Sequence, residues 1–496
     1  MYRNQYLITN AEETRPCLIG ADESRFGAWR VFCFPPLRHY LAQGANFEAL
    51  LIGLAVDPLH PARDMQQVLD HLVDVPSLTP AAIAARVEHL TGRFVLLVRI
   101  GTETHVWGDS CHLRQILYGN FGDIRCVGSS EKLMLEHAGV QLSMGPDKRA
   151  FMASSRFKRN EHAWVGPKSL DDRVFRLLPN HRLSLPGLRA EREAFHYRLP
   201  DGAGEKEVLD LAEATLRGLF TALVDRYSLI VALTAGWDTR LLMAAALPMK
   251  DRISFFTFCR AGDPSSAGDG DVAEVLAARF GLDYERIAPA PVTPEFEAAI
   301  GREQLFPRVV PKTANIQHHL GRKNRESIIN INGNGAEVAR CIYGRPGGPH
   351  SFARVCRYLG FRPSDPFVQA SLGPWHREAT EIATRTDVRM SDLAHWEQRM
   401  GIWGAATPFE QDIAIEEISP FNNTRLLLAL LTTPESDRSG PDYPLFGRLL
   451  RRLEPAAAEI PLNPHTLWFK KYVDGSATAT FLSRRIKHLY ADRSLT

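Results

Sequence analysis

The chain has 496 residues, of which 45% are hydrophobic and 23% charged, an ordinary globular balance that suffices for more than one buried core. A formal net charge of +2 argues against a basic field for nucleic acid, and no apolar run is long enough to span a membrane. The 7 cysteines form no C-x-x-C pair, and the N-terminus lacks the apolar core of a signal peptide. We therefore expect a soluble cytoplasmic protein with reduced thiols.

The first 204 residues contain short apolar or alternating runs separated by glycine, aspartate and asparagine, a pattern that predicts a strand-rich region. The predicted strands are 47–56 (FEALLIGLAV), 92–101, 104–109, 114–119 and 123–129. Helices are predicted at 64–75 and 80–90, the second opened by a proline suited to a first turn. A last hairpin (176–187) and a polar, glycine-bearing linker (193–205) close this region.

From about residue 205 helices and strands alternate. A long amphipathic helix (205–227) leads into the strand LIVAL (229–233). Further strands are predicted at 253–258, 284–287 and 327–333, with helices between them that include 272–281 and 314–324. Such alternation is typical of βαβ units, so we predict a parallel sheet with helices on both faces. After residue 345 the pattern is almost entirely helical.

Two turns that follow strands of this sheet carry the candidate chemistry, because ligands of an open parallel sheet bind at the carboxyl ends of its strands. In the first turn, TAGWDT, Ala235 and Gly236 allow a close backbone approach, and Thr234 and Thr239 offer hydroxyls. The N-terminus of the following helix suits phosphate. Asp238 fits such a site only if a divalent cation lies between carboxylate and phosphate; otherwise it is an ordinary helix cap.

The second turn, NGNGAEV, again places two glycines, Gly333 and Gly335, before an acidic residue, Glu337. Taken alone it also fits everyday Asn-Gly turn chemistry. Together, two glycine-bearing turns on one sheet could place Asp238 and Glu337 on either side of one metal–pyrophosphate unit. The sequence has no G-x-x-x-x-G-K-[ST] motif, so a Walker loop is not the phosphate binder.

These motifs resemble the asparagine synthetase family, which includes β-lactam synthetases and lasso-peptide cyclases. LTAGWDT is similar to its pyrophosphate loop, INGNGAEV to its second loop, EEISPFNNTRLLLALLTTPES to its helix-entering segment, and LWFKKYVDG to the late segment with an essential lysine. The front half, LTGRFVLLVRIG to SSEKLML, resembles the glutaminase-like sandwich that precedes this synthetase domain. The resemblance implies an Ntn-type αββα sandwich over residues 1–204 and a doubly wound, parallel-sheet PP-loop ATP-pyrophosphatase domain over residues 205–496.

The resemblance also implies that ATP and Mg2+ bind, that AMP is transferred to a substrate carboxylate, and that an amine attacks the acyl-adenylate. Asp238 and Glu337 would hold the metal, and Lys471 or Lys470 would contact phosphate or the tetrahedral intermediate. The residues expected around the nucleotide are Leu233, Thr234, Ala235, Gly236, Asp238, Thr239, Phe258, Gly333 and Gly335. The expected partners are a small-molecule or peptide carboxylate, an amine and, for a peptide, a protein that delivers it; nucleic acid and membranes are not expected.

The front half departs from the family pattern. Tyr2 is too bulky for the usual removal of Met1, so we expect no N-terminal cysteine nucleophile and no glutamine hydrolysis. Cys17 could be a nucleophile only after a leader is cleaved, and we expect it to be a small buried side chain. The front half is then a retained scaffold, and the amine comes from a source other than glutamine.

The second turn departs as well. Asn334 stands where the family often has a glutamate, and an amide cannot act as a general base at neutral pH. Tyr343, His318 and His319 are the alternative candidates for that role. Glu337 replaces an aspartate, and Mg2+ accepts either carboxylate.

These residues together predict an ATP-dependent, AMP-forming amide ligase in a specialised biosynthetic pathway, of which an intramolecular cyclisation is one form. The acidic segment AGDPSSAGDGD could clamp a cationic substrate through its aspartates, Asp263, Asp269 and Asp271, but we expect a solvated loop. One alternative is a catalytically degenerate homologue that serves as a binding or assembly subunit. Another is a tRNA-modifying ATP pyrophosphatase, against which the low net charge and the lack of a C-x-x-C pair count.

Overall fold

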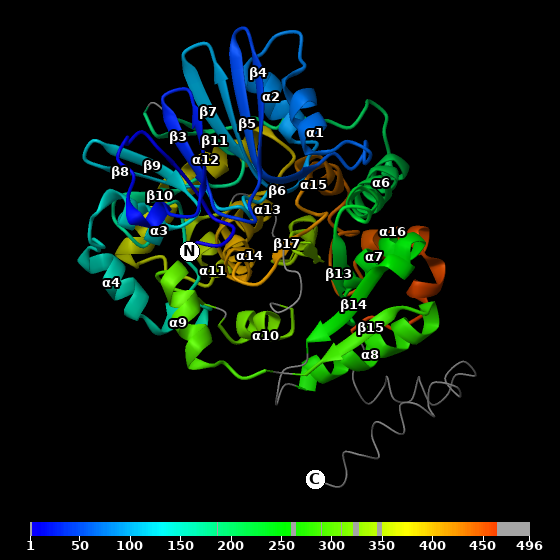
Figure 1. The fold of residues 1–496 in the computed structure, drawn as a ribbon. Coiled ribbons are helices and arrows are strands. Elements are labelled where there is room, and N and C mark those ends of the chain that lie inside the picture. The colour runs from blue at the N-terminus through cyan, green and yellow to red at the C-terminus, as the bar shows by residue number, and fades with distance from the viewer. Residues whose placement is uncertain are drawn as a thin grey trace.

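The computed structural model describes residues 2–185, 187–258, 264–288, 290–308, 310–320, 327–344 and 350–463. The architecture is a mixed α/β fold with two antiparallel sheets and one five-stranded parallel sheet (Figure 1). Within these ranges no helix is both long and apolar enough to pass through a membrane. The six cysteines that they include form no disulfide.

Both antiparallel sheets come from the first 192 residues. The first sheet has the strand order β10 (Val174–Arg176), β8 (Leu117–Phe121), β9 (Ile124–Gly128), β1 (Tyr6–Thr9), β3 (Trp29–Cys33) and β2 (Asp22–Phe26). The second has the order β12 (Arg189–Arg192), β11 (His181–Ser184), β7 (Glu103–Gly108), β6 (Thr91–Ile100), β5 (Phe47–Val56) and β4 (His39–Gly44). The strand-rich front region is therefore confirmed, whereas the last hairpin, predicted at 176–187, is formed by β11 and β12 over residues 181–192.

The two antiparallel sheets pack face to face, and helices cover their outer faces. Ile8 of the first sheet shares one core with Ile52 and Leu97 of the second. Because successive side chains of a strand point to opposite faces, Leu51 and Leu96 instead pack against α1 (Met65–Val73) and α2 (Pro80–Val87). The outer face of the first sheet packs against α3 (Glu131–Ala138) in the same way. The remaining helices of this region are α3 (Glu131–Ala138), α4 (Pro146–Ala153), α5 (Ser155–Arg159) and the short η1 (Pro16–Leu18).

The third sheet is entirely parallel. Its order is β15 (Asp283–Ile287), β14 (Ile253–Phe258), β13 (Ser228–Ala232), β16 (Ile328–Ile331) and β17 (Glu416–Ile418). Leu229 and Val231 join one core with α6 (Glu205–Leu223), α7 (Trp237–Ala246) and α16 (Pro444–Leu453). Ile230 packs against a second core with α9 (Pro294–Glu303) and α10 (Val310–Leu320). Helices thus cover both faces, as the alternation of helices and strands predicts.

The helices around and after this sheet include the predicted long helix α6 and an 11-residue π-helical segment, η4. They are α6 (Glu205–Leu223), α7 (Trp237–Ala246), η2 (Leu247–Arg252), α8 (Pro264–Phe280), α9 (Pro294–Glu303), α10 (Val310–Leu320), η3 (Ala336–Ala339), α11 (Phe352–Tyr358), α12 (Pro366–Arg385), α13 (Met390–Leu393), η4 (Ala394–Gly404), α14 (Ala405–Gln411), α15 (Thr424–Leu431), α16 (Pro444–Leu453) and η5 (Pro455–Ala458). Residues 350–463 are mainly helical, as predicted, but β17 was not predicted as a strand. The domain boundary at residues 204 and 205 stays a prediction.

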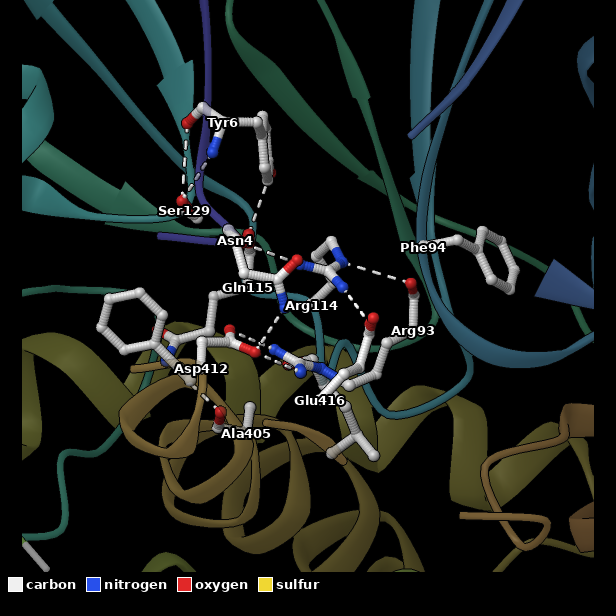
Figure 2. A network of polar contacts seen from close by, with 12 residues as sticks. Asn4, Tyr6, Arg93, Phe94, Arg114, Gln115, Ser129, Ala405, Asp412 and Glu416 are labelled. Atoms are coloured by element: carbon white, nitrogen blue, oxygen red, sulfur yellow. Dashed lines mark hydrogen bonds and ion pairs between the residues drawn. The ribbon is translucent and has the colours of Figure 1, made fainter. Parts of the chain in front are cut away.

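A buried polar network joins the front half to the segment that ends in β17 (Figure 2). Arg93 of β6 donates from Nη1 and Nη2 to the two carboxylate oxygens of Asp412, each at 2.8 Å, and Asn4 Nδ2 donates to Asp412 Oδ1 at 2.7 Å. Arg114 donates to Glu416 of β17 and to the carbonyl oxygen of Asn4 at 3.1 Å. The network therefore fixes one edge of the parallel sheet against the front half.

Candidate functional site

The candidate site lies where the order of the parallel strands reverses. The chain runs from β13 through β14 to β15, and then returns to β16 on the other side of β13. In sheets of this kind ligands bind in the crevice outside the carboxyl ends of the two strands at the reversal. The two glycine-bearing turns of the sequence leave those two strand ends, after Ala232 and Ile331. The topology therefore brings both turns to one place.

Two threonine hydroxyls hold the first turn closed. Thr234 Oγ1 lies 2.8 Å from Thr239 Oγ1, and the N–H of Thr234 donates to Thr239 Oγ1 at 3.1 Å. The N–H of Gly236 donates to Thr234 Oγ1 at 3.3 Å, and Gly236 is the N-cap of α7. No side chain caps the start of α7, so the positive end of this helix faces the turn.

A carboxylate of α8 lies against the first turn. The N–H of Ala235 donates to Asp269 Oδ1 at 3.1 Å. The prediction of a solvated loop is wrong for residues 264–271, since they belong to α8 and Asp271 pairs with Arg286 at 2.9 Å. Asp263 lies outside the described residues. The N–H of Ala235, in the predicted phosphate loop, is therefore already used in a hydrogen bond to the carboxylate of Asp269.

The two turns touch each other. A Cβ atom on Gly333 would lie 2.5 Å from Asp238 Cβ, so only glycine allows this approach. Gly335 has a φ of +96° and caps η3, the short helix that carries Glu337. The close approach at Gly333 and the positive φ at Gly335 thus both require glycine. This geometry brings Glu337 near Asp238, as the sequence pattern predicts.

Arg340 binds both acids, although the sequence pattern did not single it out. Arg340 Nη2 donates to Asp238 Oδ2 at 2.8 Å and lies 3.5 Å from Glu337 Oε1. The guanidinium carbon also lies over the rings of Tyr443 and Phe446, 5.2 and 5.7 Å from their centres. A signal was present in the sequence, because Arg340 follows Glu337 by three residues, and that spacing aligns side chains in a 3₁₀ turn.

Each of the two acids keeps one oxygen without a partner. Asp238 Oδ1 and Glu337 Oε2 are buried atoms that make no hydrogen bond. Burial and the negative charge of Glu337 raise the pKa of Asp238 to about 7, against the opposing charge of Arg340. Such oxygens fit Mg2+, which takes one or two carboxylates together with phosphate oxygens. Over the described part of the chain, no group of three or more His, Cys, Asp or Glu side chains could hold a metal ion by itself.

Asn334 is oriented by a residue that sequence reasoning missed. Asn334 Nδ2 donates to Glu417 Oε1 at 3.3 Å, and Asn330 Nδ2 donates to Glu417 Oε2 at 3.0 Å. Glu417 belongs to β17 and is buried. Only the amide nitrogen of Asn334 can donate to this carboxylate, so its carbonyl oxygen is left as the acceptor for another group.

Tyr343 packs in an aromatic cluster beside η3. Its hydroxyl lies 3.3 Å from His395 Nδ1, and its ring stacks on Tyr358 with centres 4.7 Å apart. Burial raises the pKa of Tyr343 to about 12, and burial together with the charges of Arg399 and Arg340 lowers the pKa of His395 to about 3. Both groups are neutral at pH 7, far from the pKa that favours a general base. Tyr343 is therefore better suited to hydrogen bonding than to proton abstraction.

Four further predicted residues make contacts other than the one between the turns. Leu233 is buried in the core, and its N–H donates to a carbonyl of β14. Phe258 is the last residue of β14, and its ring centre lies 6.3 Å from that of His319 on α10. His319 Nε2 lies 3.1 Å from the carbonyl oxygen of Ala288, and His318 is its neighbour on α10. Nothing in these contacts links the two histidines to the acids.

The last described segment returns to the first turn. The N–H of Asn463 donates to the carbonyl oxygen of Ala235 at 3.1 Å. Arg240 of α7 is buried and donates to the carbonyl oxygens of Pro461 at 2.9 Å and of Ala235 at 3.4 Å. Lys470 and Lys471 follow a few residues later in the sequence and lie outside the described residues.

Comparisons with known proteins give only a distant likeness. No family model matches the chain, and no curated protein matches it either. Among solved structures, glutamine phosphoribosylpyrophosphate (PRPP) amidotransferase from B. subtilis, complexed with ADP and GMP, is 11% identical with a TM-score of 0.23, over 68% of this chain and 71% of that one. A structure of the allosteric regulatory enzyme of purine biosynthesis is 12% identical with a TM-score of 0.24, over 66% and 68%. At this distance the likeness carries no argument about function.

Proposed function

We propose that the chain is an ATP-dependent amide ligase that releases AMP and pyrophosphate. One observation carries the proposal: two touching glycine turns at the strand reversal present Asp238 and Glu337, each with a buried oxygen that has no partner. A Mg2+ ion that carries the phosphates of ATP would satisfy both oxygens. We infer an asparagine-synthetase-like PP-loop domain over residues 205–496 and a glutaminase-like sandwich without glutamine hydrolysis over residues 1–204.

In the proposed reaction a substrate carboxylate attacks the α-phosphorus of ATP and pyrophosphate leaves; an amine then attacks the acyl carbon and AMP leaves. Mg2+ held by Asp238 and Glu337 would neutralise charge on the phosphates. The start of α7 would bind the phosphates through its first backbone N–H groups, and the closed first turn would hold that end of the helix in place. We assign the phosphate-contacting lysine to Lys471 or Lys470 on the resemblance of LWFKKYVDG to the lysine-bearing segment of the asparagine synthetase family.

The amine is proposed to come from a donor other than glutamine, in the same molecule as the carboxylate or in a second one. Asn334 cannot take a proton at neutral pH, but its carbonyl oxygen, oriented by Glu417, can accept a hydrogen bond from an attacking amine. The front half would then act as a scaffold. Its Arg114 binds Glu416, the residue before Glu417 on β17, so the front half supports the strand that orients Asn334.

A second candidate, a binding or assembly subunit without catalysis, is favoured by one specific feature. Polar groups of the chain already fill part of the site, since Asp269 takes the N–H of Ala235 and Arg340 takes one oxygen of Asp238. A site of this kind could hold a ligand without turning it over.

Incubation of the full chain with ATP, Mg2+ and a pool of carboxylates and amines separates the two candidates. The ligase should release AMP and pyrophosphate, and Asp238→Asn should weaken the binding of ATP with Mg2+ by tenfold or more. Asp283→Asn is the matched control, because Asp283 is an exposed carboxylate at the start of β15 and should leave binding unchanged.

Three other outcomes have defined meanings. ATP binding that depends on Asp238, without AMP from any substrate, would favour the binding subunit. AMP formation only in the presence of tRNA would favour a tRNA-modifying ATP pyrophosphatase. ATP binding that is absent, or indifferent to Asp238→Asn, would overturn the assignment of a nucleotide site at these turns.

A further inference from the structure

Arg340 is held from two sides. Its guanidinium binds Asp238 Oδ2 at 2.8 Å and lies 3.5 Å from Glu337 Oε1 on one side, and it stacks over the rings of Tyr443 and Phe446 on the other. The arginine side chain is 12% exposed. Arginine binds carboxylates and aromatic faces at once because its charge is planar and delocalised. Moving it away would break both sets of contacts, so a positive charge is fixed beside the two acids.

The contacts of Arg340 leave acceptors and a donor unused. Asp238 Oδ1 and Glu337 Oε2 are buried without partners, and so is Arg340 Nε. Free carboxylate oxygens suit a cation, whereas a free guanidinium N–H suits an anion. The cluster therefore has free carboxylate oxygens that suit the metal ion and a free guanidinium N–H that suits the phosphate of a metal–phosphate complex.

The positive charge of Arg340 weakens the binding of a metal ion alone. With both acids ionised, Asp238, Glu337 and Arg340 sum to one negative charge. A divalent cation that binds the two free oxygens would lie close to the guanidinium and be repelled by it. Mg2+ also gives up its water reluctantly, and two carboxylates replace only a minority of its six ligands. Phosphate oxygens supply more ligands and at the same time neutralise the guanidinium.

We propose that Arg340 makes cation binding at Asp238 and Glu337 dependent on phosphate, so that the metal enters as its complex with the nucleotide. The inference rests on the proposed function and deepens it. Arg340 repels the free divalent cation and attracts the phosphates that accompany it. Arg340 is then a specificity-determining residue, because it favours binding of the metal–nucleotide complex over binding of the metal alone or of the nucleotide alone.

Binding of Mn2+, a spin-active substitute for Mg2+, tests this on the full chain by electron paramagnetic resonance. The charge-removing variant Arg340→Met should bind Mn2+ alone at least tenfold more tightly than the natural chain does. In the presence of ATP the order should reverse, with the Mn2+–ATP complex bound at least tenfold more weakly by Arg340→Met. Arg340→Lys keeps the charge and should stay within about threefold of the natural chain for Mn2+ alone.

Arg425→Met is the matched control, because the Arg425 guanidinium also stacks on a tyrosine, Tyr197, at 4.9 Å but binds no carboxylate of the site. It should leave both Mn2+ measurements unchanged. If Arg340→Met does not fold, Arg340→Gln replaces it, since glutamine keeps a donor without the charge.

The outcomes for Arg340 and for the ligase are separable. Equal or weaker binding of Mn2+ alone by the uncharged variant would overturn the role of Arg340, even if ATP binds. Tighter binding of Mn2+ alone together with no binding of ATP to any form would support the charge effect on the metal and would overturn both the coupling to phosphate and the proposed function.

Discussion

The molecule has two clusters in which arginines pair with carboxylates, and they differ in whether every acid has an arginine of its own. At the interface shown in Figure 2, Arg93 and Arg114 face Asp412 and Glu416, so each acid has an arginine of its own. Arg93 and Asp412 are 1% and 3% exposed, and every oxygen of Asp412 accepts a hydrogen bond. This cluster is closed, because each charge has a partner within the protein and both oxygens of Asp412 accept hydrogen bonds.

The cluster at the glycine turns has a single arginine for two acids. Asp238 and Glu337 are 20% and 35% exposed, and each retains one buried oxygen without a partner. A closed cluster fixes the packing of two regions, whereas an open one leaves groups that a ligand can satisfy. Substitutions at the interface should therefore reduce stability, and substitutions at the turns should reduce ligand binding.

Asp412→Ala should produce the largest loss of stability. It leaves the buried guanidinium of Arg93 without its carboxylate, and breaking a buried ion pair from one side costs about 3–5 kcal/mol. The measurement is the unfolding transition in urea, followed by circular dichroism. Glu12→Ala is the control: Glu12 pairs with Arg25 in an exposed ion pair and should not move the transition. A small shift for Asp412→Ala would mean that the interface is not fixed by this pair.

Glu88 extends the comparison to a buried carboxylate that forms no ion pair with an arginine of the described residues. Its two oxygens accept the backbone N–H groups of His196 and Tyr197, at 2.8 and 2.6 Å. Burial raises its pKa from 4.5 to about 7. The native state therefore holds the proton more tightly than the unfolded chain does, so the contribution of Glu88 is most favourable at low pH and falls as the pH rises from 4.5 through 7.

The loss over that range is on the order of 3 kcal/mol for a shift of this size. Glu88→Gln cannot ionise and removes this dependence. The difference in unfolding free energy between the natural chain and Glu88→Gln should therefore shrink or reverse between pH 5 and pH 8. A difference that stays constant with pH would show that Glu88 keeps an ordinary pKa.

The local pattern predicted the position of both turns but not the contacts of the arginines. Strand periodicity and glycine placement are local, so the ends of β13 and β16 could be read from the sequence. Arg114 and Glu416 lie 302 residues apart, and only the folded chain pairs them. β17 has only three residues, too few to show the alternation of apolar and polar side chains that marks a strand. It forms by pairing with β16 in the parallel sheet.

At the candidate site, Asp238 and Glu337 were predicted as a pair and do lie together with Arg340. The position of Asp269 could not be predicted, because the sequence AGDPSSAGDGD is rich in loop-forming residues and its helix depends on packing against the sheet. The role of Glu417 depends on the pairing of β17 with β16, which places it beside Asn330. The acids could therefore be predicted, and the groups that orient them could not.

Gly333→Ala tests the contact between the turns without changing any charge. The added methyl group would lie 2.5 Å from Asp238 Cβ, and overpacking of this kind costs about 1–3 kcal/mol. Binding of ATP with Mg2+ should fall at least tenfold, because Asp238 and Glu337 move apart. The control is Gly301→Ala in α9, where no atom lies within 4 Å of the new methyl group and helix propensity should stabilise the chain by about 0.5–1 kcal/mol.

Thr239→Val should give the smallest loss of stability at the open cluster. It preserves the shape of the side chain and removes the hydroxyl that accepts from the N–H of Thr234 and bonds to Thr234 Oγ1. A hydrogen bond of this type contributes about 1 kcal/mol, and the partly exposed Thr234 can turn to water, so the unfolding transition should move little. The first turn should loosen, however, and the affinity for ATP with Mg2+ should fall more than the stability does. Thr239→Ser retains the hydroxyl and should keep most of that affinity. Equal losses of affinity in Thr239→Val and Thr239→Ser would show that the methyl group, and not the closed turn, matters for binding.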